Sequence, residues 1–327
     1  MDIQYLLFLQ NIREAVGDVF NSFCIFITTI AVDYYILVPA LVLFWTVDKR
    51  KGSRVLLSWG TSLGIGAFLK AMFCVYRPWI KDNRIHPAEE VLSGATGYSF
   101  PSGHSFSAGG FWNSIALCYR KYKSIVHFSV LILLLTMFSR NYLGVHTPQD
   151  VLVGGIVSFL CAWGIIKLCD YIDKNPNKDW TVFLVVTIVV ATLLCYIALK
   201  QYPQDYVDGV LLVDPKKMTV DGFKDPGRFY GIFLGWFLER RFVKFSTDVS
   251  VPKKVARALI GGLLTVFWWT TVAGPIGKML GTNWGYFLTQ ASTPVIFMVV
   301  YPALCFEKQK SDSQNYLNNG SNDKSLN

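Results

Sequence analysis

Long apolar stretches separated by short polar loops constrain the fold of this chain more than any other feature. A helix that crosses a bilayer needs about 20 mostly apolar residues, because each residue rises ~1.5 Å through a hydrocarbon core of ~30 Å. We expect spans at residues 33–47, lengthened by the apolar residues 20–31, and at 54–76, 102–119, 124–138, 148–168, 180–199, 228–238, 255–276 and 284–306. The stretch at 228–238 is the weakest, because it is short. The sequence therefore predicts an all-α fold, a polytopic membrane helix bundle.

The composition agrees with a membrane protein. Hydrophobic residues make up 52% of the chain and charged residues only 16%, which is too few charges for an ordinary soluble domain. The net charge of +9 comes from short basic clusters between apolar runs, a pattern typical of orientation in a bilayer, so we expect no nucleic-acid partner. The seven cysteines contain no Cys-x-x-Cys pair and are interpreted as small buried apolar residues.

Charge in the connecting loops predicts which face is which. The basic loops are 48–54, 120–123 and 240–257, and basic loops face the cytoplasm. Counting spans along the chain then puts the loops 77–102 and 139–148 on the opposite, extracytoplasmic side. Residues 1–19 carry apolar residues at helical spacing and are expected to form an interfacial helix. Residues 307–327, rich in Ser, Asn and Asp, are expected to be a disordered cytoplasmic tail.

Lys70 lies near the end of the expected span at 54–76, and Arg77 directly follows that span. Lys70 and Arg77 are seven residues apart, close to two helical turns, so both project from one face if the helix continues until Pro78 ends it. A lysine inside a span costs ~2.5 to 3.5 kcal/mol unless it finds water or a counter-charge. The alternative is a lysine that reaches the interface along its apolar stem, beside an interfacial arginine.

The segment Pro101-Ser102-Gly103-His104 opens the next apolar run. Proline suits a first helical turn, and the amides of that turn lack intrahelical partners, so they can bind an anion. Ser102 adds a hydroxyl donor, and Gly103 lets an anion approach the backbone closely. The alternative is an ordinary helix start with a capping serine, which explains Ser102 but not His104.

A third segment, residues 139–150, places Arg140 six residues before His146 and Asp150 four residues after it. Thr147 and Pro148 have the pattern of a helix N-cap and first position, so Asp150 is either the acidic half of a capping box or the group that orients the imidazole of His146. The two roles are compatible, and we favour orientation.

These three segments resemble the signature of the type 2 phosphatidic acid phosphatase family, which is related to vanadium-dependent haloperoxidases and acid phosphatases. The family pattern is Lys-x6-Arg-Pro, then Pro-Ser-Gly-His, then Ser-Arg-x5-His-x3-Asp, and every position is filled here. The resemblance covers about residues 70–168 and implies a six-helix phosphatase-type core with extra C-terminal transmembrane helices. We divide the chain into the interfacial helix (1–19), the catalytic core (20–174), added helices of open role (175–306) and the tail (307–327).

The resemblance also implies a mechanism. His146, held by Asp150, attacks phosphorus to give a phosphohistidine, while His104 protonates the leaving group and later activates water. The phosphate is bound by Lys70, Arg77, Ser102, Gly103 and Arg140. No metal or other cofactor is expected, because these positions hold no cluster of carboxylates and histidines of the kind that binds magnesium or zinc.

The sequence leaves the substrate open. A site at the outer interface suits an amphiphile, so the expected partners are membrane lipids and a lipid phosphate or polyprenyl diphosphate substrate. The candidates are phosphatidate, a polyprenyl diphosphate, phosphatidylglycerol phosphate and a sphingoid-base phosphate, and the C-terminal half resembles, more weakly, that of some sphingoid-base phosphate phosphatases. A small soluble substrate such as a sugar phosphate is a further alternative. A phosphotransferase uses the same residues with an acceptor hydroxyl in place of water. A transporter of a phosphate lipid also explains Lys70 but not the histidine pair with its orienting carboxylate.

Overall fold

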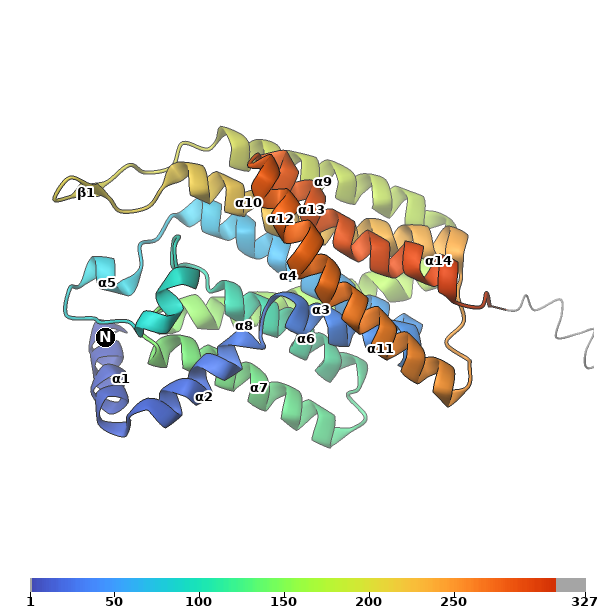
Figure 1. Cartoon of the computed structure of the whole chain (residues 1–327), viewed down its shortest axis with the longest axis horizontal. Coiled ribbons are helices and arrows are strands. Elements are labelled where there is room, and N and C mark those ends of the chain that lie inside the picture. Colours follow the sequence, from blue (N-terminus) through green and yellow to red (C-terminus); the bar gives the residue numbers. More distant parts are fainter. Residues whose placement is uncertain (1, 310–327) are drawn as a thin grey trace, which may run out of the picture.

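Helices account for nearly all of the regular structure, as the long apolar stretches predict (Figure 1). A computed structural model describes residues 2–309. The helices are α1 (Asp2–Val16), α2 (Asp18–Thr29), α3 (Asp33–Val42), α4 (Lys49–Phe73), α5 (Pro78–Lys81), α6 (Gly103–Cys118), α7 (Lys123–Tyr142), α8 (Pro148–Lys174), α9 (Asp179–Leu199), α10 (Pro215–Leu238), α11 (Val251–Phe267), α12 (Gly274–Leu280), α13 (Asn283–Val295) and α14 (Tyr301–Cys305). The all-α fold class is therefore confirmed.

Short elements join these helices. Helical turns of 3-10 or π type are η1 (Leu43–Val47), η2 (Glu89–Gly94), η3 (Pro176–Lys178), η4 (Glu239–Val243), η5 (Trp268–Ala273) and η6 (Ile296–Val300). The strands β1 (Tyr206–Val207) and β2 (Val210–Leu211) form an antiparallel hairpin, which the sequence did not predict, with Tyr206 opposite Leu211. Residues 310–327, most of the expected tail, lie outside the described residues.

By length and composition, six helical segments of residues 2–309 are suited to crossing a membrane, or up to seven if the bent α2 and α3 pair forms one span. The six are Lys49–Lys81, Lys123–Tyr142, Pro148–Lys174, Pro176–Leu199, Val251–Leu280 and Asn283–Cys305. The protein is therefore an integral, multi-pass membrane protein. The expected spans at 102–119 and 228–238 correspond to α6, which is only 16 residues long, and to the last part of α10.

The first expected span is bent, because α2 and α3 meet at an angle of 55°. The expectation of one continuous helix from Lys70 to Arg77 is wrong. The helix that carries Lys70 does not continue to Arg77: α4 ends at Phe73, and Cys74 takes a left-handed conformation with φ 48°. Pro78 then starts α5 instead of ending α4. Lys70 and Arg77 therefore do not share a helix face.

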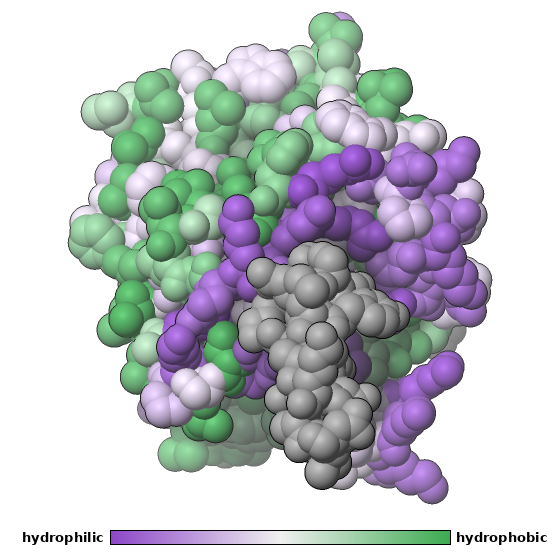
Figure 2. Space-filling view, turned by 90° about the vertical axis from the view of Figure 1, so that its right-hand side faces the viewer, coloured by the Kyte–Doolittle hydropathy of each residue, from purple (hydrophilic) through white to green (hydrophobic). Residues whose placement is uncertain are grey.

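The helix ends separate the loops into two groups. The loops that carry the three motifs lie at one end of the long axis, at the left of Figure 1, where α1 lies across the bundle. The basic loops lie at the other end, on the right, together with the last described residues. Figure 2, which looks onto this second end, shows hydrophilic side chains gathered there and apolar side chains on much of the surrounding surface.

α4 lies at the centre of the bundle, packed against α6, α8 and α10. Its buried residues Trp59 and Leu63 belong to a large apolar cluster that also takes in Ile232 and Phe233 of α10. Helices from both halves of the chain thus share one hydrophobic core. This packing fixes the position of α10 beside the motif-bearing end of α4.

Candidate active site

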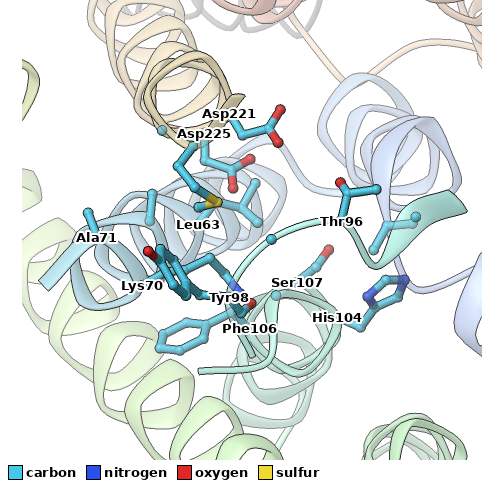
Figure 3. Close-up of a pocket in the computed structure, with 18 of the residues that line it drawn as sticks. Leu63, Lys70, Ala71, Thr96, Tyr98, His104, Phe106, Ser107, Asp221 and Asp225 are labelled. Carbon is cyan, nitrogen blue, oxygen red and sulfur yellow. Dashed lines mark hydrogen bonds between the residues drawn. The ribbon is translucent and has the colours of Figure 1, made fainter. Parts of the chain in front are cut away.

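The three motifs meet around one cavity of about 380 Å³. Six of the eight residues proposed from the sequence line it: Lys70, Arg77, Gly103, His104, Arg140 and His146. They come from α4, the loop before α5, the start of α6, the end of α7 and the loop before α8, so packing of distant segments brings them together. Figure 3 shows Lys70 and His104 among the residues around this space.

The geometry around His146 fixes which ring nitrogen carries the proton. Nε2 lies 2.9 Å from Nη1 of Arg77, and Nδ1 lies 3.3 Å from Oδ2 of Asp150. A guanidinium donates hydrogen bonds but does not accept them, so Nε2 must accept. In the neutral ring the proton then sits on Nδ1, facing Asp150. This tautomer leaves Nε2 with the lone pair that a nucleophile needs.

Asp150 combines capping with contact to His146, as the two compatible interpretations allow. It forms a capping box with Thr147 at the start of α8: its Oδ2 accepts the amide of Thr147 at 2.8 Å, and its own amide bonds to the Thr147 hydroxyl. The side chain is only 3% exposed. The helix start therefore holds the carboxylate in the position from which it faces the imidazole.

Ser99 also contacts this pair, which the sequence did not predict. Its hydroxyl donates to Oδ2 of Asp150 and lies 3.3 Å from Nδ1 of His146. Ser99 is buried, and its amide donates to the carbonyl of Val75 at 2.7 Å, which ties it to the segment that carries Arg77. A single serine in a loop has no periodic signal, and only its position three residues before Ser102 hints at a role.

Three cations line the cavity without an acidic partner among residues 2–309 within ion-pair distance. Lys70 donates to the carbonyl of Tyr98 at 2.8 Å, and Arg77 donates to the carbonyls of Gly97 and Val145, each at 2.9 Å. Arg140, 2% exposed, donates to the hydroxyl of Thr28 at 2.8 Å. Its Nε finds no partner in the described part of the chain. Buried or half-buried cations without carboxylates are typical of an anion-binding site.

The start of α6 offers backbone rather than side-chain donors. Gly103 is exposed to the cavity, and a Cβ atom built on it meets nothing within 4 Å. Ser102 is fully buried, does not line the cavity, and accepts the amide of Ser105 as the helix N-cap. His104 lines the cavity and is partly exposed. The capping interpretation therefore describes the Ser102 hydroxyl, while its role as a phosphate donor stays a prediction.

Burial and charge both favour a neutral His146. The side chain is 2% exposed, and the pKa of His146 is held well below its ordinary value, first by burial and then by the cations Arg77, Arg140 and Lys70.

Within residues 2–309, no three His, Cys, Asp or Glu side chains lie close enough together to hold a metal ion. The independence from metal expected from the sequence stays a prediction.

Comparisons with known proteins agree with the motifs. Residues 51–174 match the PAP2 superfamily, and residues 223–311 match a family described as PAP2 superfamily phosphatase, transmembrane extension. Undecaprenyl-diphosphatase BcrC of Bacillus subtilis (strain 168) is 30% identical over 177 residues, which cover 53% of this chain and 86% of that protein. The chain belongs to the PAP2 superfamily.

A second relative of this PAP2 protein is an undecaprenyl-diphosphatase of Sulfolobus acidocaldarius, 28% identical over 145 residues, or 43% of this chain and 68% of that protein. No solved structure matches the chain. The PAP2 membership, the transmembrane extension and the membrane-spanning helices together make the protein a membrane phosphatase with a helical core and added C-terminal transmembrane helices.

The PAP2 motifs form only one side of the cavity. The opposite side includes residues that the sequence did not single out, and most come from α10: Met218, Asp221, Gly222, Asp225 and Arg228, together with Asp33 at the start of α3. The charged residues of α10 were overlooked because they lower the apolar character by which spans are recognised.

Proposed function

We propose that this PAP2 phosphatase hydrolyses a lipid phosphate monoester or diphosphate through a phosphohistidine intermediate, without metal, at the extracytoplasmic membrane face. The observation that carries the proposal is the position of Nε2 of His146. It accepts a hydrogen bond from Arg77 among three cations, and Nδ1 faces Asp150. A binding site for an anion needs the cations but not a nucleophile with an orienting carboxylate.

In the first step the lone pair of His146 Nε2 forms a bond to phosphorus, and the bond from phosphorus to the leaving oxygen breaks. His104 gives its proton to that oxygen. In the second step His104 takes a proton from water, the water oxygen attacks phosphorus, and the N–P bond breaks to release inorganic phosphate. His146 returns to its starting tautomer because Asp150 keeps the Nδ1 proton throughout.

The three cations stabilise the phosphate as its equatorial oxygens gain negative charge. Arg77 has a second role, since its Nη1 donates to the lone pair of His146 Nε2. An incoming phosphate oxygen attracts this guanidinium more strongly than a neutral imidazole does, so substrate binding frees the nucleophile. The amide of Gly103, a residue exposed to the cavity, supplies a further donor.

A polyprenyl diphosphate is one lipid substrate with support from the comparisons, because both relatives carry the name undecaprenyl-diphosphatase. Apolar residues of the cavity, Leu63, Ala67 and Phe106, continue from the cations toward the middle of the bundle. This arrangement suits a phosphate attached to an apolar chain. The basic loops lie at the end of the bundle opposite the motifs, and basic loops favour the cytoplasm. This pattern supports an extracytoplasmic location of the motifs.

The proposal is tested by phosphate release from lipid monophosphates and polyprenyl diphosphates by the purified protein in detergent with EDTA. We expect release by the wild type and its loss in His146→Ala. Release that requires added metal, or release by His146→Ala at the wild-type rate, contradicts the proposal. Addition of a lipid alcohol separates a phosphotransferase, which forms a new phosphate ester, from a hydrolase.

A further inference from the structure

An arginine of α1 is buried at the motif-bearing end of the bundle. Arg13 is 7% exposed, and no carboxylate lies within ion-pair distance of it among residues 2–309. A buried guanidinium is costly unless its donors are satisfied, so this position needs a reason. α1 lies outside residues 51–174, which match the PAP2 superfamily, and none of the three motifs includes it. The family match therefore assigns no role to Arg13.

Arg13 joins two segments that are far apart in the sequence. Its Nη1 donates to the carbonyl of Tyr142 at 3.3 Å, and its Nη2 donates to the carbonyl of His86. Tyr142 is the last residue of α7, so its carbonyl has no partner within that helix, and a cation is favourable at a helix C-terminus. The guanidinium thus connects the end of α7 with the loop that follows α5.

Gln10, almost one helical turn before Arg13, binds the same loop. Its Nε2 donates to the carbonyl of Arg84 at 3.3 Å, and its Oε1 accepts the amide of His86 at 2.8 Å. Both α1 residues are buried on one face of the helix, as a spacing of three residues allows. Because these contacts go to backbone atoms, they fix the path of the loop.

The loop also packs on the turn at residues 143–146, which ends in the proposed nucleophile. The amide of Ala88 donates to the carbonyl of Leu143 at 3.1 Å. Gly144 has a left-handed φ of 73°, and a Cβ atom built on it would lie 3.4 Å from Nη1 of Arg13. α1, the loop and the turn are therefore in contact at one place, two residues before the nucleophile.

The turn is held from the cavity side by different residues. Arg77 Nη1 donates to the carbonyl of Val145, and Asn141 Nδ2 donates to the carbonyl of His146, each at 2.9 Å. Arg77 also donates to Nε2 of His146 and, in the proposed reaction, to the phosphate. Arg13 does not line the cavity, so its contact with the turn does not depend on the substrate.

We propose that Arg13, supported by Gln10, is a positioning residue of this phosphatase. It holds the turn at 143–146 against the loop at 84–88, so that Nε2 of His146 is aligned with phosphorus. A displacement of ~1 Å at a reacting atom slows a reaction by about 100-fold. The inference rests on the proposed phosphohistidine mechanism and adds α1, outside the PAP2 motifs, to the parts of the chain on which that mechanism depends.

The test measures phosphoenzyme formation from a radiolabelled aryl phosphate in a His104→Ala background, in which the intermediate persists. We expect Arg13→Gln to lower the rate constant of labelling about tenfold and to leave the final amount of label unchanged. Arg13→Lys keeps the charge but reaches only one of the two carbonyls, so its rate constant is intermediate. Glu14→Gln, at an exposed neighbouring position on α1, is the matched control and labels at the parent rate.

Two results of this experiment overturn the proposal. An unchanged rate constant in Arg13→Gln shows that the turn does not need the guanidinium. A smaller final amount of label at the parent rate constant assigns Arg13 to the stability of the fold, because unfolded protein takes no label while folded protein reacts normally.

Hydrogen exchange tests the same contact without activity. In Arg13→Gln we expect the amides of residues 84–88 and 143–146 to exchange about tenfold faster, while those of residues 155–165 in α8 exchange as in the wild type. Absence of label on the parent protein contradicts the phosphohistidine mechanism, and exchange then decides the role of Arg13 separately. Faster exchange in both segments supports the positioning role, and unchanged exchange at 143–146 rejects it.

Discussion

The tautomer of the His146 imidazole is set by the neighbouring side chains and not by the residue alone. Spacing along the sequence is sufficient to identify His146 together with Lys70, Arg77, His104 and Arg140, because the motifs place these residue types at fixed offsets. All five residues line the cavity. The tautomer of His146 could not be predicted, because it depends on Arg77, which lies 69 residues away. Likewise, nothing in the sequence indicates that Ser99 contacts Asp150.

The lowered pKa of His146 makes a prediction about pH. A nucleophile must be neutral, and a pKa below the ordinary 6.5 keeps His146 neutral as the pH falls through that value. We therefore expect the acidic limb of kcat/KM to lie below pH 6.5. Arg77→Gln removes a nearby positive charge, so it raises the pKa of His146 and moves this limb to higher pH.

The measurement is a pH profile of kcat/KM for the wild type and Arg77→Gln on a lipid phosphate. Lys121→Gln, which removes an exposed cation at the opposite end, serves as the control and keeps the wild-type limb. An acidic limb above pH 6.5 in the wild type contradicts a buried, cation-surrounded nucleophile.

Ser99 is predicted to position the Asp150 carboxylate. Ser99→Ala removes the hydroxyl that donates to Oδ2, so we expect kcat to fall about tenfold, a cost of about 1.4 kcal/mol, while KM changes little. Ser99→Thr keeps a hydroxyl and restores part of the activity. Ser124→Ala, exposed at the other end of α7, is the control. A change in KM alone argues for a role in substrate binding instead.

At the scale of elements, the sequence located most helices but misplaced several ends. α4 ends at Phe73 although the next residues, Cys74 and Val75, are apolar, and the reason is tertiary: the carbonyl of Val75 accepts the amide of Ser99 in the loop that carries the second motif. α10 begins 13 residues before the expected start at Arg228, because its polar first half faces the cavity and so lacks the apolar pattern of a span.

The packing of α10 on α13 depends on small residues. A Cβ atom on Gly231 comes within 2.3 Å of the carbonyl oxygen of Ala291, and one on Gly227 within 2.6 Å of that of Phe287. Small residues four apart allow such close helix contacts in membranes. Gly231→Leu is therefore expected to separate the helices, lower the melting temperature and reduce activity, because it displaces the α10 residues that line the cavity.

Thermal unfolding followed by an activity assay tests this packing. Gly164→Leu on α8 is the matched control, since a Cβ atom at Gly164 meets nothing within 4 Å. We expect Gly164→Leu to have the melting temperature and the activity of the wild type. Equal melting temperatures for both variants show that α10 and α13 do not require the close contact.

For the whole molecule, sequence patterning predicts both the bundle and the separation of its two ends. Loop charge assigns the ends to membrane faces because basic loops are retained in the cytoplasm. The four-part division of the chain and the orientation stay predictions. The sequence could not reveal that core and extension share one cavity, because that depends on the contact between α4 and α10.

The orientation is tested by cysteine labelling in intact cells. Asn83→Cys lies in the exposed loop at the motif end, and Lys121→Cys lies at the basic end. We expect a membrane-impermeant maleimide to label Asn83→Cys above the level of the parent chain and to leave Lys121→Cys at that level until the cells are opened. The reverse pattern places the motifs in the cytoplasm.

The central claim, that His146 is the nucleophile, is tested most directly by trapping the phosphoenzyme. Purified protein is mixed with a radiolabelled aryl phosphate, whose leaving group needs little protonation, and is quenched in base, in which phosphohistidine survives. We predict that the wild type carries label, that His104→Ala accumulates more because its intermediate reacts slowly with water, and that His146→Ala carries none. Label retained on His146→Ala, or turnover by the wild type without any labelled enzyme, contradicts the account.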